Sequence, residues 1–228
     1  MIIKERLLQQ AIGEIRFKPK LSFHRYRFDL SDKFLEKLPS WNLNWRIIEL
    51  FDQKEKEKSN RIFSLTNHAA SLLFKKLGVY ENFKSLAQFL FENTVKDLNI
   101  DSFIRYGIRL FYLYEIDLSF ANLKDHLLGR LYKDDLFRAI EITPAPEDLA
   151  YVIVFKRANK KFRLTLGPLS REEIRNNFAE DSDLEVALLI DIDCYFENIP
   201  ARETRPFLAE SFHEISKMRE QLDAYLQG

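Results

Sequence analysis

The sequence contains one cysteine, Cys194, and only six glycines in 228 residues. A single cysteine excludes an internal disulfide bond, so we expect a protein of a reducing compartment, the cytoplasm. The few glycines form neither a G-x-x-x-x-G-K-[ST] nor a G-x-G-x-x-G motif, which argues against a phosphate-binding loop. No apolar run approaches the ~20 residues of a membrane-spanning helix. The N-terminal residues Met1 to Gln10 also lack the apolar core of a signal peptide.

The sequence has no excess of charge and no recognisable catalytic pattern. Its 35 basic residues balance its 35 acidic residues, which removes the strong positive field typical of nucleic-acid-binding proteins. The four histidines and the cysteine do not form an H-x-x-x-H or C-x-x-C pattern, so a structural zinc site has no support. A G-x-S-x-G nucleophile motif is also missing. The sequence alone therefore does not favour an enzyme.

Aromatic residues are abundant, with 20 Phe and nine Tyr. Aromatic side chains bury large apolar areas and favour strands, so we predict an aromatic core. An aromatic binding surface is the alternative. The proportion of hydrophobic residues, 46%, beside 31% charged residues is ordinary for a folded globular protein.

The clearest secondary-structure pattern covers residues 184–196, where apolar residues alternate strictly with other residues. One face contains Leu184, Val186, Leu188, Ile190, Ile192, Cys194 and Phe196. An alternation with a period of two predicts a strand with one face on a core. Because the other face is half apolar, we expect a central strand. Residues 101–116 show a second alternation of this kind.

The remaining segments repeat one order of elements. In the first half we expect strands or extended segments at 11–17, 22–30, 45–52 and 61–74, a short helix that begins at Ser31 and ends at Pro39, a helix at 80–98, the long strand at 101–116 and a helix from 119. In the second half we expect short strands at 137–142, 151–156 and 162–166, a helix opened by a capping box of Ser170 and Glu173, the long strand at 184–196 and a helix at 201–226.

This order predicts an α+β fold with mostly antiparallel strands, because the strands occur in runs. We expect helices on one face and two pseudo-repeated halves, each with the order strand, strand, strand, helix, long strand, helix. The halves are residues 1–133 and 134–228. No glycine- or serine-rich linker separates them, so we expect them to pack closely as one unit.

Four short segments resemble a family of sporadically distributed, uncharacterised bacterial and archaeal proteins of about this length. They are Ala11-Ile-Gly-Glu-Ile-Arg-Phe17, Arg105-Tyr-Gly-Ile-Arg-Leu-Phe-Tyr112, Asp191-Ile-Asp193 and Phe212-His-Glu214. The resemblance implies a stand-alone protein without an established activity, and it supplies no catalytic residues. Members of the family carry an asparagine soon after the second arginine of the central strand, where this chain has Leu110, Phe111 and Tyr112.

Asp191 and Asp193 stand two residues apart on a predicted strand and therefore project from the same face. Convergent carboxylates are ligands that Mg²⁺ or Mn²⁺ can use. If the halves repeat, Glu115 and Asp117 lie at the symmetric position and complete a metal site. The alternative is an ion-paired sheet face, in which the acids meet Arg105, Arg109, Arg163 or Lys156.

A second candidate site is a basic cluster at a predicted hairpin. It consists of Lys156, Lys160, Lys161 and Arg163, with Arg157 beside them. Such a cluster can bind the phosphates of a nucleic acid, or it can simply keep a turn solvated. The apolar stripe of the last helix is a further possible surface for a protein partner or a second copy of the chain.

From these observations we expect a cytoplasmic binding or interaction protein without catalytic activity, with no bound cofactor and with a homodimer as one possibility. The alternative is a Mg²⁺- or Mn²⁺-dependent enzyme that acts on phosphate esters or nucleic acid through Asp191 and Asp193. A weaker alternative is a nucleic-acid-binding module that uses the hairpin cluster.

Overall fold

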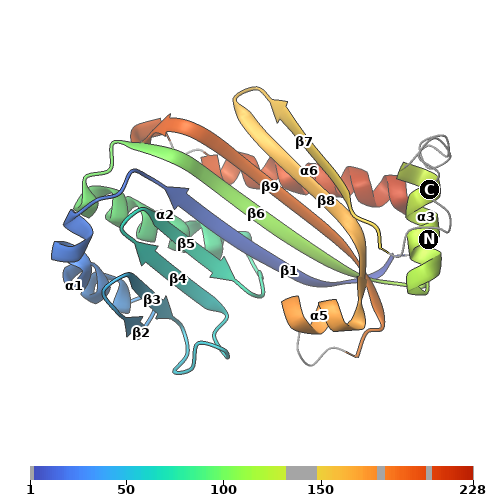
Figure 1. Cartoon of the computed structure of the whole chain (residues 1–228), viewed down its shortest axis with the longest axis horizontal. Helices are drawn as coiled ribbons and strands as arrows, with labels where there is room; N and C mark the ends of the chain where they lie inside the picture. The colour runs from blue at the N-terminus through green and yellow to red at the C-terminus, as the bar shows by residue number, and fades with distance from the viewer. Residues whose placement is uncertain (1–2, 132–147, 179–182, 204–206, 228) are drawn as a thin grey trace.

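The computed structural model describes residues 3–131, 148–178, 183–203 and 207–227. Its centre is one sheet of nine strands in which every pair is antiparallel (Figure 1). The strands are β1 (Ile3–Arg16), β2 (Ser40–Leu43), β3 (Ile47–Phe51), β4 (Arg61–Thr66), β5 (Ala69–Phe74), β6 (Ser102–Ile116), β7 (Tyr151–Arg157), β8 (Lys160–Ser170) and β9 (Val186–Pro200). Their order is β2-β3-β4-β5-β1-β6-β9-β8-β7. The expected α+β fold with an antiparallel sheet is confirmed.

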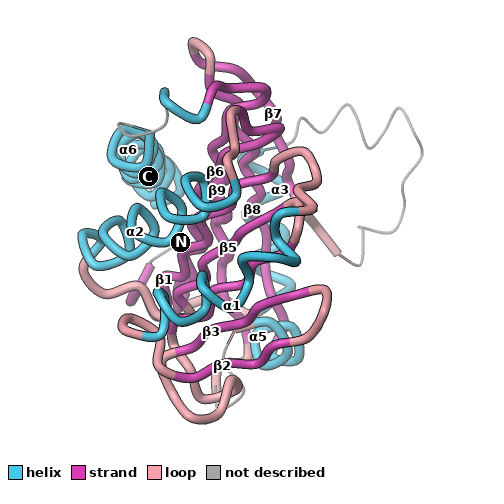
Figure 2. The backbone as a smooth tube through the Cα atoms, turned by 90° about the vertical axis from the view of Figure 1, so that its left-hand side faces the viewer, coloured by secondary structure: helices cyan, strands magenta, loops and turns pink. Residues whose placement is uncertain are grey.

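The helices lie on both sides of this sheet. They are α1 (Ser22–Leu35), α2 (Tyr80–Leu98), α3 (Phe120–Leu131), α5 (Arg171–Asn177) and α6 (Phe207–Gln227), with a short 3₁₀ helix η1 (Ala201–Glu203) after β9. Helices α2 and α6 cover one face, whereas α5 lies on the other (Figure 2). The expectation that all helices share one face is therefore wrong for α5, which packs Ile174 against Leu113 and Ala187. None of the described helices is long and apolar enough to span a membrane.

Strands β6 and β9 lie side by side at the centre of the sheet, and both predicted long strands are found. The register places Leu110 opposite Ile192 and Ile108 opposite Cys194, and all four side chains are fully buried. Strand β9 is flanked by β6 and β8, so its predicted central position is also confirmed. The strict alternation of the two sequences thus produces a continuous apolar surface beneath α6.

The first half differs from the sequence-based expectation. Residues 22–30 belong to helix α1 and do not form an extended segment. Phe23, Leu30 and Phe34 are spaced by seven and four residues, which places them on one helical face, and all three are fully buried. The free energy gained by burying this helical face outweighs the weak strand-like alternation of polar and apolar residues at 22–30.

The predicted pseudo-repeat is not confirmed. The first half contributes α1 and the strands β2 to β5, and the described part of the second half has no counterpart to this group. Residues 61–74 form two strands, β4 and β5, which meet at a turn at Asn67 and His68. The strand predicted at 137–142 lies outside the described residues.

The apolar side of the sheet has an aromatic core, as predicted. Its fully buried side chains include Phe17, Phe23, Phe34, Phe63, Phe83, Phe162 and Phe207. Phe34 meets Phe63 edge to face with ring centroids 5.3 Å apart, and Phe74 meets Phe83 in the same way. Pairs of this geometry stabilise a fold by about 0.5–1.5 kcal/mol beyond the area that they bury. Aromatic contacts therefore join α1 and α2 to the sheet.

The only cysteine supplies a probe of the fold. Cys194 is fully buried, and burial raises the pKa of its thiol to about 12. Because the thiolate is the reactive form, we expect the native protein not to react with a chromogenic aromatic disulfide reagent at pH 8. Labelling should become rapid and stoichiometric in denaturant. Stoichiometric labelling of the native protein within the mixing time would contradict the burial of Cys194.

Candidate functional site

The two acids of strand β9 are held by two arginines of strand β6. Arg109 donates to Asp191 through Nε at 2.8 Å and Nη2 at 2.6 Å. Arg105 donates through Nη2 to both carboxylate oxygens of Asp193, at 2.7 and 2.6 Å. The two carboxylate side chains are only 6% and 12% exposed. The ion-paired sheet face considered in the sequence is thus present, with Arg105 and Arg109 as the cations.

These ion pairs fix the positions of both guanidinium groups. The hydrogen bond to Asp191 raises the pKa of Arg109, whereas burial raises the pKa of Asp193 and the hydrogen bonds from Arg105 oppose that rise. Arg105 also stacks over the ring of Tyr195, 4.2 Å from its centroid. Gly107 makes room for this arrangement, because a Cβ atom there would lie 2.9 Å from Cβ of Tyr195. Both arginines are therefore preorganised on the sheet surface.

The other predicted metal ligands lie elsewhere. Strand register pairs Asp191 with Phe111 and Glu115 with Ala187, so Glu115 is displaced from Asp191 by four residues, roughly 13 Å along the strand. Asp117 follows the end of β6. Within the described residues, no three His, Cys, Asp or Glu side chains are grouped as metal ligands. The metal hypothesis remains a prediction, and Asp191 and Asp193 are the two of its four residues that lie together.

The structure also separates the four residues of the predicted nucleic-acid site. Lys160 points to the helical side of the sheet, where Nζ lies 3.2 Å from Glu210 and 2.7 Å from Glu214 of helix α6. Burial alone would lower the pKa of Lys160, but the hydrogen bonds to these carboxylates raise it. Lys160 is 6% exposed and serves as a buried link between the hairpin and α6. The alternation of strand β8 explains why its neighbour Lys161 faces the opposite side.

Lys156, Lys161 and Arg163 remain on the side of the sheet opposite α2 and α6, which we call the open face. Lys161 forms an ion pair with Glu197. Lys156 and Arg163 are exposed, and among the described residues no carboxylate forms an ion pair with either of them. The acids near them on this face, Asp191 and Asp193, are already neutralised by arginines. The open face of β7 and β8 therefore carries excess positive charge.

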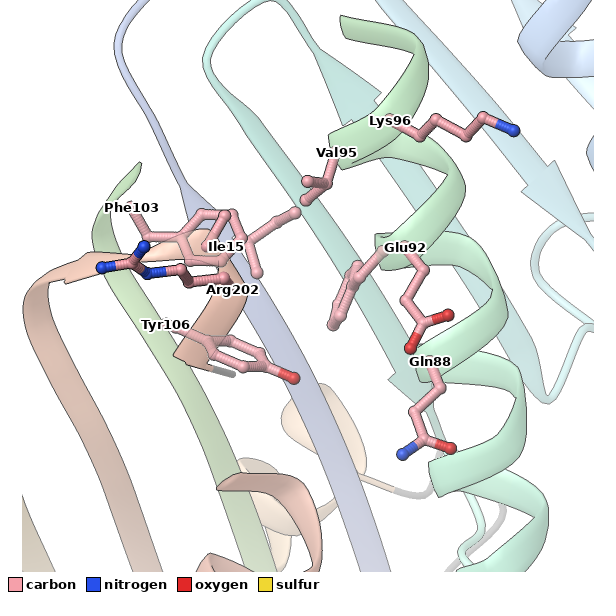
Figure 3. A pocket seen from close by; sticks show the side chains of 10 residues that line it. Ile15, Gln88, Glu92, Val95, Lys96, Phe103, Tyr106 and Arg202 are labelled. Carbon is pink, nitrogen blue, oxygen red and sulfur yellow. The ribbon is translucent and has the colours of Figure 1, made fainter. Parts of the chain in front are cut away.

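A pocket on the helical side of the sheet was missed in the sequence. It has a volume of about 330 Å³ and lies between α2, strands β1 and β6, and the start of η1 (Figure 3). Its walls include Ile15, Phe91, Phe103 and Tyr106. These residues come from three separate elements, and each appears in the sequence as an ordinary apolar core position. No local pattern distinguishes them, so only the tertiary structure identifies the pocket.

Comparisons with known proteins add no identification. No model of a known protein family matches this chain, and no curated protein is similar to it. The resemblance found in the sequence therefore stays a prediction. Function has to be argued from the geometry of the open face and of the pocket.

The role of the acid pair can be tested by titration with metal ions. Because arginines occupy the carboxylate oxygens, we expect no saturable heat when Mg²⁺ or Mn²⁺ is added at millimolar concentration to the wild type. Asp191→Ala should instead lower the free energy of unfolding by about 1–3 kcal/mol, since Arg109 loses a nearly buried, charged hydrogen-bond partner. Saturable heat that disappears in Asp191→Ala would favour the metal hypothesis.

The buried link at Lys160 can be tested in denaturant. We expect Lys160→Met to lower the free energy of unfolding by about 1–3 kcal/mol, because the buried ammonium holds two carboxylates. Lys161→Met is the matched control on the open face, where solvent screens the ion pair and its loss should change stability much less. Equal effects of the two substitutions would show that Lys160 does not join the hairpin to α6.

Proposed function

We propose that this protein is a cytoplasmic binding protein without catalytic activity, and that its open face binds an acidic region of a partner protein. The observation that carries this proposal is the pair of exposed cations, Lys156 and Arg163, which lack ion-pair partners among the described residues. Arg163 and Arg109 lie on the two strands that flank β9, and both are in register with Asp193. The cations of the surface thus exceed the carboxylates that could neutralise them.

The chemistry of arginine supports a carboxylate-bearing partner. A guanidinium group has five N–H donors in a planar fork that fits a carboxylate. Arg109 uses Nε and Nη2 on Asp191, while its side chain is still 43% exposed. A second carboxylate can therefore approach its outer edge. Because the ion pair already fixes the arginine, little side-chain entropy is lost when a partner binds.

The neighbouring strand adds apolar contacts to this surface. Val152 and Val154 of β7 are 47% and 62% exposed, and in the register Val154 is opposite Arg163. Exposed valines beside unpaired cations favour a partner that alternates acidic and apolar side chains. A second copy of the chain with the same face would bring like charges together, so self-association through this face is disfavoured.

An acidic peptide is a direct probe of the open face. We expect a fluorescent peptide of alternating Glu and Val to bind at low salt, and Lys156→Glu/Arg163→Glu to weaken its binding by roughly tenfold or more. A Gln-Val peptide of the same length should bind far more weakly. Fluorescence anisotropy at several salt concentrations measures both affinities, and the Glu-Val affinity should fall as salt screens the charges.

A matched double variant separates local recognition from net charge. Lys54→Glu/Lys76→Glu changes the charge of the protein by the same amount at exposed positions away from β7 and β8. We expect this control to change peptide affinity by less than about twofold, since screening limits the influence of distant charges. An equal loss in both double variants would contradict the proposed surface. Tighter binding of a single-stranded oligonucleotide than of the peptide would favour the nucleic-acid alternative.

A further inference from the structure

The pocket under helix α2 is separate from the open face, since it lies on the helical side of the sheet. Its apolar walls come from α2, β1 and β6, and Ala201 and Arg202 of η1 also line it. Figure 3 shows the hydroxyl of Tyr106 turned toward α2, from which Glu92 and Gln88 extend. Lys96, by contrast, points away from it.

The pocket lies beside a point where the central ladder skips one pair of residues. The register between β6 and β9 passes over Ile104 and Asn198, and Asn198 has a left-handed backbone with φ of 53°. Phe103 and Tyr106 are both buried although they are three residues apart, whereas Ile104 between them is 49% exposed. In an uninterrupted strand, residues three apart face opposite sides. The interruption thus turns two aromatic rings toward α2.

The hydroxyl of Tyr106 is the strongest sign of a ligand. The residue is only 5% exposed, and its hydroxyl points into the pocket (Figure 3). Among the described residues, this hydroxyl is not one of the buried polar atoms left without a partner, so it is open to the pocket space. Ligand pockets are mostly apolar and use a few such polar groups to orient the bound molecule. A molecule that accepts a hydrogen bond here would complete the site.

The charged and polar side chains of the pocket indicate which polar groups such a ligand carries. Burial, and then the nearby Tyr80 and Glu92, raise the pKa of Tyr106, so its hydroxyl stays protonated and can donate. Gln88 and Glu92 line the pocket from α2, and the carboxylate of Glu92 can accept a hydrogen bond. A ligand with an acceptor beside an N–H donor could accept a hydrogen bond from the hydroxyl of Tyr106 and donate one to the side chains of α2.

The apolar walls of the pocket indicate the size and shape of the rest of the ligand. Phe91, Phe103 and the ring of Tyr106 are aromatic, and Ile15 and Val95 complete an apolar lining. A volume of about 330 Å³ is at the lower end of the range for small-molecule sites. We infer that this pocket binds a small, neutral aromatic molecule with an acceptor beside an N–H donor, such as an aromatic carboxamide or a heterocyclic base.

Benzamide is the simplest probe of this chemistry, because its carboxamide places a carbonyl acceptor beside an N–H donor on a flat ring. We expect saturation-transfer NMR and calorimetry to detect its binding to the wild type. Tyr106→Phe keeps the ring and removes the hydroxyl, and it should weaken benzamide by roughly two- to tenfold, the range for one hydrogen bond. The affinity of toluene should not change in this variant.

Two further variants serve as controls. Tyr225→Phe makes the same chemical change near the C-terminus, where the hydroxyl contacts the carbonyl oxygen of Arg130, and should leave benzamide binding intact. Val95→Trp fills the pocket and should abolish binding, with Cys194 labelling as the check that the variant is folded. Lys156→Glu/Arg163→Glu should bind benzamide normally, so failure of one proposal does not affect the other.

Competing ligands test the assigned class. Phenethylamine carries a cation and phenylacetate an anion on rings of similar size. Tighter binding of either one than of benzamide would overturn the inference of a neutral ligand. No benzamide binding by the wild type, or an equal loss of benzamide and toluene in Tyr106→Phe, would overturn the site itself.

Discussion

The antiparallel ladder between strands β6 and β9 is the constraint on which the rest of the structure depends. Its apolar side, which includes Leu110 and Ile192, forms the floor of the core, while its other side carries Arg109 and Asp191. A shift of one residue in either strand would exchange these faces. Charged groups would then enter the core beneath α6 at a cost of several kcal/mol each. The alternation of two sequences therefore fixes one register.

The carboxylates of β9 have a structural explanation in this ladder. A buried carboxylate is unfavourable unless it receives hydrogen bonds from a cation, and Arg109 and Arg105 provide them to Asp191 and Asp193. Neither pair is directly opposite in the register: Arg109 is opposite Asp193 and reaches Asp191 two residues away, whereas Arg105 is opposite Glu197 and reaches Asp193 four residues away. A neighbour two residues off is within reach of long side chains, and the side chain of Arg105 spans the larger offset to Asp193. Each pair is therefore made only when the strands are correctly aligned.

The parts of the fold that sequence analysis predicted well are those governed by local periodicity. Strand β9, helix α2 and the capping box of Ser170 and Glu173 all follow from the spacing of neighbouring residues. Residues 22–30 of helix α1 were missed because the buried Phe23 and Leu30 are separated by polar residues that also fit an extended segment, whereas the helix expected from Ser31 is its last part. Tertiary burial of one face decided between the two conformations.

The candidate sites were less predictable, because they depend on which strands become neighbours. The pairing of Arg105 with Asp193 was one of several options considered. Alternation within a strand predicts which side of the sheet each residue faces, but it does not predict which residue of the next strand lies opposite. The separation of Lys160 from Lys161 follows from the alternation of β8, yet the partner of Lys160 lies 54 residues away at Glu214. The pocket at Tyr106 depends on an interruption opposite Asn198, which no local pattern in β6 reveals.

The same interruption links the two sides of the sheet. Phe103 and Tyr106 face the pocket, while Arg105 between them faces the open side and holds Asp193. Packed protein interiors transmit small displacements because they contain few voids. A change in the backbone of residues 103–106 would therefore alter the pocket wall and the position of Arg105 together. One short segment of β6 positions side chains of both candidate sites, although the sheet separates the two surfaces.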